Sequence, residues 1–112
     1  MPITELRTVA DAEAMLGASE ARPVVLLKHS VACYASQKGE GQFMRLDGPD
    51  GPPLYRVVVQ YARPVSNYVA ERLNVRHETP QALVIHRGRV ILRLNHSDID
   101  TERLRDAARL AA

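Results

Sequence analysis

The sequence of 112 residues predicts one α/β domain, residues 1–112, in which helices cover both faces of a mixed β-sheet. Apolar residues make up 46% of the chain and charged residues 25%, which is typical of a globular protein and argues against disorder. Short Val- and Leu-rich runs alternate with segments of helical periodicity, as expected for strands and helices in turn. The last two runs flank a tight turn at Gly88, which indicates an antiparallel hairpin.

The first half of the chain is predicted to form a helix, a buried strand and a second helix. Thr8 is suited to cap a helix that Gly17 is expected to end. Residues 24–27 are all apolar, as in a strand that is buried on both faces. A helix is expected to begin near Cys33 and to place Phe43 in the core.

The second half is predicted to hold strand 54–60, helix 64–73, strands 81–86 and 89–94, and a final helix that opens at Asp100. The strand–helix–strand unit crosses over right-handed, so its two strands are parallel. With the antiparallel hairpin they make a four-stranded mixed sheet with helices on both faces. This order of elements is that of the thioredoxin-like architecture.

Charge and hydropathy exclude several classes of function. The formal net charge is +2 and the basic residues are scattered, so we expect no nucleic-acid partner. No apolar run approaches the roughly 20 residues that span a bilayer, and we expect no membrane partner. The amino terminus has neither the basic start nor the apolar stretch of a signal peptide. A cytoplasmic location is therefore expected.

The chain has one cysteine, Cys33, which excludes an intrachain disulfide framework and a four-thiolate zinc site. It lies where a predicted strand gives way to a predicted helix. Unpaired N–H groups and the helix dipole at such a position stabilise the thiolate, and Lys28 and His29 add positive charge nearby. The alternative is a small, buried and inert cysteine, and both interpretations stay open at this point.

Two further residues are candidates for the same site. Ser36 follows Cys33 by three residues, and its hydroxyl can donate a hydrogen bond to a thiolate one turn away. The alternative is an ordinary serine in a first helical turn. Pro80 precedes a predicted strand, which is compatible with either a strand start or a cis turn.

The four histidines lack the close spacing of metal ligands, and we expect no metal site. His29 and His77 flank the segments that contain Cys33 and Pro80, so both are candidates to line an active site. The alternative for each is a structural or surface histidine.

Three blocks of the sequence carry a resemblance to a known family. They are Lys28-His29-Ser30 with Cys33 and Ser36, then residues 65–81 with the run His77-Glu78-Thr79-Pro80-Gln81, and His96-Ser97-Asp98-Ile99. In this order and over residues 24–99 the chain resembles the YtxJ-like monothiol bacilliredoxins, thioredoxin-superfamily proteins of the bacillithiol redox system. It departs from the family pattern at Tyr34, Pro64 and Thr79.

The resemblance implies a thioredoxin fold in which Cys33 is the redox thiol and faces a cis Pro80. Thr79 would offer its backbone to an extended substrate chain. We group His77 with Thr79 and Pro80 as substrate-binding residues. Lys28, His29 and Ser36 would support the thiolate. The implied activity is removal of bacillithiol from protein cysteines.

The same resemblance implies no bound cofactor, with bacillithiol as an exogenous co-substrate. The expected partners are bacillithiolated client proteins, a low-molecular-weight thiol and an external reductase. We expect a monomer or a weak dimer.

Two alternative functions are compatible with the same fold. One is a non-catalytic binding module that holds a partner through the Thr79–Pro80 edge. The other is a dimer that shares an iron–sulfur cluster through Cys33 and exogenous thiols, as Cys-x-x-Ser glutaredoxins can. The absence of a glycine after Cys33 disfavours the cluster.

Overall fold

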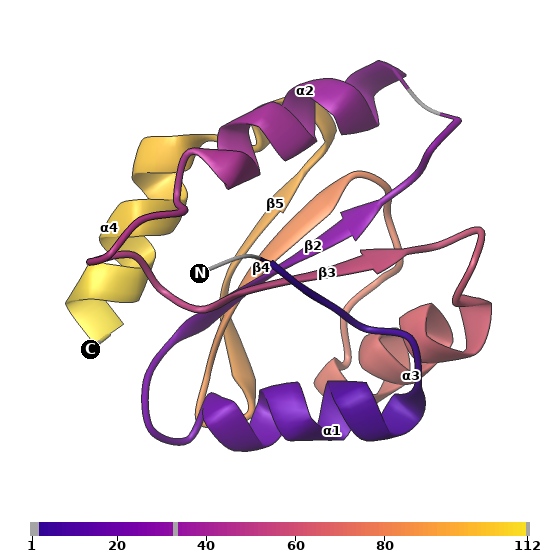
Figure 1. The fold of residues 1–112 in the computed structure, drawn as a ribbon, viewed down its shortest axis with the longest axis horizontal. Coiled ribbons are helices and arrows are strands. Elements are labelled where there is room, and N and C mark those ends of the chain that lie inside the picture. The colour runs from indigo at the N-terminus through magenta and orange to yellow at the C-terminus, as the bar shows by residue number, and fades with distance from the viewer. Residues whose placement is uncertain (1–2, 33, 112) are drawn as a thin grey trace.

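A computed structural model describes residues 3–32 and 34–111, in which helices pack on both faces of a five-stranded sheet (Figure 1). The elements in chain order are β1 (Thr4–Glu5), α1 (Val9–Ala18), β2 (Val24–His29), α2 (Tyr34–Met44), β3 (Leu54–Val58), α3 (Arg63–Leu73), β4 (Gln81–His86), β5 (Arg89–Asn95), the 3₁₀ helix η1 (His96–Asp98) and α4 (Thr101–Ala111).

The strands follow the order β1-β3-β2-β4-β5, with β2 in the centre. β2 is parallel to β3 and antiparallel to β4, and β4 forms the predicted hairpin with β5. The prediction of four strands was wrong, because the two-residue β1 pairs in parallel with β3 and places Thr4 opposite Tyr55. A strand of two residues is too short to show a period in the sequence, so only its pairing reveals it.

β2 is buried along its whole length, and its side chains alternate between the two faces of the sheet. Val24 and Leu26 pack in one core cluster with residues of α1 and α3, whereas Val25 and Leu27 pack in a second with residues of α2 and α4. Figure 1 shows these two pairs of helices on opposite sides of the sheet. The same alternation directs Lys28 toward the α3 side and His29 toward the α2 side. These two adjacent residues therefore enter different surroundings.

The start of α1 was predicted correctly and its end was not. Thr8 caps the helix by accepting the Asp11 N–H at 3.1 Å, and the Asp11 carboxylate accepts the Thr8 N–H at 3.1 Å. Gly17 does not stop the helix, which continues to Ala18. The buried Ser19 ends it instead, since its hydroxyl donates to the Leu16 carbonyl at 2.6 Å.

α2 begins directly after residue 33, as the sequence indicates, and Gly39 brings it close to the sheet. A Cβ atom at Gly39 would lie 3.0 Å from Cδ1 of Ile99 and 3.3 Å from Cβ of Pro80. The missing side chain thus allows the helix to lie against the segment that contains Pro80.

β3 ends at Val58, two residues earlier than predicted. The N–H groups of Tyr61 and Ala62 both bond to the Val58 carbonyl at 3.1 Å, which turns the chain into α3. This turn leaves Gln60 beyond the strand, beside the segment that follows β2.

Candidate redox site

The candidate site lies where β2 ends and α2 begins. Cys33 itself lies outside the described residues, so its predicted role as the redox thiol stays a prediction at this stage. The structure describes its neighbours on both sides, Ala32 and Tyr34, and the groups that hold them.

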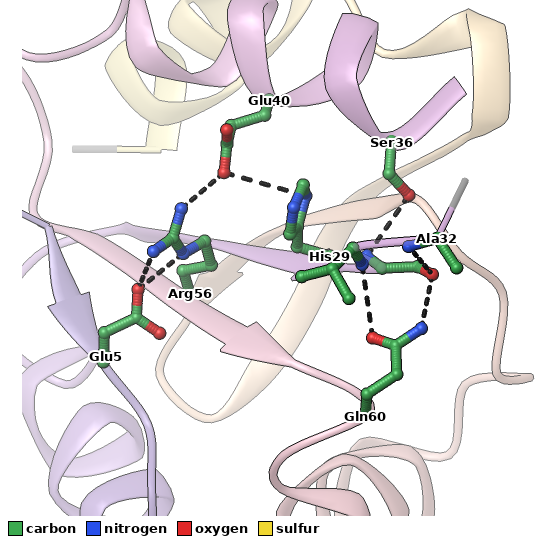
Figure 2. A network of polar contacts seen from close by, with 9 residues as sticks. Glu5, His29, Ala32, Ser36, Glu40, Arg56 and Gln60 are labelled. Atoms are coloured by element: carbon green, nitrogen blue, oxygen red, sulfur yellow. Dashed lines mark hydrogen bonds and ion pairs between the residues drawn. The ribbon is translucent and has the colours of Figure 1, made fainter. Parts of the chain in front are cut away.

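Three successive backbone N–H groups precede residue 33, and a side-chain oxygen accepts each of them (Figure 2). The Ser30 N–H donates to Ser36 Oγ at 3.2 Å, and the Val31 N–H donates to Gln60 Oε1 at 3.3 Å. The Ala32 N–H donates to Ser30 Oγ at 3.3 Å. The loop between β2 and α2 is thus fixed by side chains rather than by backbone pairing.

Ser36 lies in the first turn of α2 and is fully buried. Its oxygen accepts the Ser30 N–H, and a hydroxyl that accepts one hydrogen bond still has its own proton to donate. No hydrogen bond among the described residues uses that proton. The Ser36 hydroxyl is therefore available to donate to a group at position 33, one helical turn earlier.

Lys28 is fully buried, and its Nζ lies 2.7 Å from Nδ1 of His77. Burial lowers the pKa of Lys28 to about 8, because the charged ammonium group loses its contact with water. The sequence assigned Lys28 and His77 to different roles, and the structure makes them hydrogen-bond partners. At neutral pH the ammonium form still dominates.

The pKa of His77 is lowered by partial burial and, to a smaller extent, by the charge of Lys28. The imidazole is therefore neutral at pH 7, with Nδ1 as the acceptor from Lys28 and the proton on Nε2. Ser66 Oγ of α3 lies 3.4 Å from the same Nδ1. This cluster carries a single positive charge and connects the centre of the sheet to the loop before Pro80.

His29 lies on the opposite side of β2, with Nδ1 at 3.7 Å from Oε2 of Glu40 in α2. Arg56 of β3 donates to the same Glu40 oxygen, and its Nε donates to Oε1 of Glu5 at 2.5 Å. Burial lowers the pKa of Arg56, but the two carboxylates outweigh it and raise the value. Figure 2 shows this network joining β1, β3 and α2.

The Thr79–Pro80 peptide bond is cis, and Pro80 is buried beside Gly39 of α2. The Pro80 carbonyl accepts the His96 N–H at 2.8 Å. No hydrogen bond among the described residues uses the backbone N–H or C=O of Thr79. All three sequence blocks of the resemblance therefore meet at one end of the sheet.

A cavity of about 560 Å³ lies beside α2 at this end of the molecule. It is lined by residues of α2, of η1 and of the two positions between η1 and α4, among them Ala35, Lys38, Gly39, His96 and Ile99. The sequence did not indicate this cavity, because its walls come from two distant segments.

Among the residues that the structure describes, no three His, Asp or Glu side chains gather as metal ligands would. In the same part of the chain, no helix has the length and apolar character to cross a membrane.

Gln60 is the site residue that sequence reasoning missed. It belongs to no motif and lies 29 and 30 positions from its hydrogen-bond partners Val31 and Ser30. The one available signal was its place after a Val-rich strand that runs parallel to β2, because such strands end at the same edge of a sheet.

Comparison with known proteins decides the family. The family model of the monothiol bacilliredoxin BrxC matches residues 4–104. The chain belongs to the monothiol bacilliredoxin family. The family predicted from the three sequence blocks is thereby confirmed, and membership supports a redox function through a thiol.

Solved structures show that the fold is that of thioredoxin. A candidate oxidoreductase with a thioredoxin fold is 30% identical, with a TM-score of 0.84 over 94% of this chain and 92% of that chain. The thioredoxin of Fasciola hepatica is 15% identical, with a TM-score of 0.77 over 98% and 100% of the two chains. The Schistosoma mansoni thioredoxin pre-protein is 17% identical, with a TM-score of 0.76 over the whole of both chains. The two thioredoxins show the fold alone.

Proposed function

We propose that this bacilliredoxin-family chain is a monothiol thiol–disulfide oxidoreductase that removes bacillithiol from protein mixed disulfides. The observation that carries the proposal is the family match over residues 4–104 of a chain with a single cysteine, Cys33. A lone thiol cannot close a disulfide within its own chain, so it must exchange with partners.

In the proposed step the Cys33 thiolate attacks the bacillithiol sulfur of the mixed disulfide. The bond between bacillithiol and the client breaks as the bond to Cys33 forms, and the client leaves as a thiolate that takes up a proton. One disulfide replaces another, so no electrons are gained or lost overall. A second low-molecular-weight thiol, kept reduced by an external reductase, then releases bacillithiol from Cys33.

The surroundings of residue 33 favour the thiolate form. The N–H groups of the first turn of α2 and the free proton of Ser36 are donors to an anion at this position. The charge that Lys28 shares with His77 adds an electrostatic contribution from within the sheet. His29 Nδ1 lies 3.7 Å from Glu40 Oε2 and has no hydrogen-bond partner among the described residues, so His29 is kept as a residue that supports the thiolate.

Client docking would use the groups on the rim of the site. The backbone of Thr79, to which none of the described residues hydrogen-bonds, is suited to pair with an extended client segment. Val31 and Tyr34 lie on either side of position 33 in the sequence and are exposed, with relative accessibilities of 51% and 75%.

The test is bacillithiol transfer followed by intact-protein mass spectrometry. A client with one bacillithiolated cysteine is mixed with the wild-type chain or with Cys33→Ser. We expect the wild type to gain one bacillithiol as the client loses it, and Cys33→Ser to do neither. Transfer by Cys33→Ser, or none by the wild type, would overturn the proposal. A wild type that only binds the client, equally well with Cys33→Ser, would instead indicate a binding module.

A further inference from the structure

Gln60 is attached to the segment before the redox thiol by both ends of its carboxamide. Its Nε2 donates to Ser30 Oγ at 2.6 Å, and its Oε1 accepts the Val31 N–H at 3.3 Å (Figure 2). These two bonds join the end of β3 to the loop between β2 and α2. The parallel pairing of β3 with β2 brings the two segments to the same edge of the sheet.

The effect of Gln60 extends one residue further through Ser30. The Ser30 oxygen that accepts from Gln60 also accepts the Ala32 N–H at 3.3 Å. Gln60 therefore fixes one N–H directly and orients the acceptor of the next. From the other side, Ser36 of α2 accepts the Ser30 N–H. Residues 30–32 are thus held between Gln60 and the first turn of α2.

We propose that Gln60 is a positioning residue for the redox thiol, holding residues 30–32 in the geometry that keeps Cys33 reactive. This inference rests on the proposed function in taking Cys33 as the reacting group. A carboxamide suits the task because it donates and accepts at once, whereas an apolar side chain of similar length does neither. Gln60 is exposed on its outer side, so its replacement removes no core packing.

The test compares Gln60→Met with the wild type in two readouts that need no bacillithiol. The first is hydrogen exchange of the Val31 and Ala32 amides by NMR, and the second is the rate of Cys33 alkylation by iodoacetamide across a pH series. Loss of one hydrogen bond is expected to speed Val31 exchange about fivefold. We expect the alkylation rate at pH 7 to fall by about the same factor, with the midpoint of the pH profile moved upward.

Two further variants make the result specific. Asn67→Met removes an exposed amide of α3 and is expected to change neither readout. Ser30→Ala removes the other partner of the Gln60 bond and should reproduce the slower alkylation. The double variant should be less impaired than the product of the two single effects, because both remove the same bond. Thermal unfolding of each variant checks that the fold is retained.

If Cys33 is alkylated in Gln60→Met at the same rate as in the wild type, the inference is overturned, whether or not the Val31 amide exchanges faster. Slower alkylation with unchanged exchange of the Val31 and Ala32 amides would also overturn it, because Gln60 would then not act on Cys33 by holding residues 30–32. A wild type that fails to transfer bacillithiol contradicts the proposed function and leaves both of these readouts intact. The two failures are therefore distinguishable.

Discussion

The two faces of the sheet each hold a positive charge near β2, and the two charges have different surroundings. On the α3 side Lys28 is fully buried and hydrogen-bonds to a neutral imidazole, that of His77. On the α2 side Arg56 lies in a partly exposed network between the carboxylates of Glu5 and Glu40. Both cations lie near the same end of the sheet, and their environments differ in burial and in counterions.

This difference moves the two pKa values in opposite directions. Burial lowers the pKa of Lys28 to about 8, whereas the two carboxylates raise the pKa of Arg56 despite its partial burial. The α3 side therefore holds a charge that can be lost within a few pH units of neutrality, next to the Thr79–Pro80 segment. The α2 side holds a permanent charge that connects β1, β3 and the helix after Cys33. The burial of each cation and its hydrogen-bond partners, rather than the number of basic residues, therefore decide whether the charge on each side can be lost near neutral pH.

The largest expected effect is a dependence of stability on pH that comes from Lys28. Between pH 8 and 10.5 the unfolded chain keeps a proton that the folded chain has lost, so the wild type becomes more stable as pH rises. The gain is on the order of 3 kcal/mol over this range. In Lys28→Met this gain should disappear, and the variant should be the more stable protein at pH 7. Urea denaturation at pH 7 and pH 10 measures both.

Lys38→Met is the matched control, because Lys38 is exposed on α2. It should keep the pH dependence of the wild type. Equal pH dependence in the wild type and Lys28→Met would mean that the buried charge is not the one described.

A smaller effect tests how closely α2 is fitted to the cis-proline segment. Gly39→Ala forces a Cβ atom against Ile99 and Pro80, and we expect a net loss of about 1 kcal/mol after the gain in helix propensity. Gly41→Ala lies on the same helix with nothing within 4 Å, and we expect a gain of up to about 1 kcal/mol. Chemical denaturation of both variants gives the comparison. Equal stabilisation by the two alanines would contradict the close fit.

The smallest effect concerns the charge network of the α2 side. Arg56→Leu leaves Glu5 and Glu40 without their shared partner, and we expect a loss of about 1 kcal/mol that shrinks in high salt. Glu102→Gln, which breaks the exposed pair with Arg105, should change stability by about zero. A pH- and salt-independent loss in Arg56→Leu would show that its packing matters and its charge does not.

Much of the fold follows from local patterns, and the site follows from them only in part. The runs of Val and Leu and the cap at Thr8 act within a few residues, so β2, α1 and the hairpin were predictable. β1 exists only because it pairs with β3, and no local period marks it. In the same way the sequence placed Lys28 and His77 in one site but not in one hydrogen bond, since 49 positions separate them.

Gln60 and the Glu40–Arg56 pair show the same limit more clearly. Their partners come from other segments of the chain, and an Arg in a strand or a Gln just after one is compatible with many roles. Ser36 was singled out for its three-residue spacing from Cys33, and that contact lies outside the described residues. Its bond to the Ser30 N–H was not predicted, because Ser30 lies before α2 and shares no helix repeat with it. Local spacing indicates which residues share a helix face, whereas contacts across the sheet need its register.

The central claim is that Cys33 is an activated thiolate, and the pH profile of its alkylation tests this most directly. The chain has one cysteine, so the mass increase on alkylation reports on Cys33 alone. We expect a midpoint clearly below the ordinary thiol pKa of about 8.5, because the helix start, Ser36 and the charge on Lys28 all favour the anion. A midpoint at or above about 8.5 would contradict it.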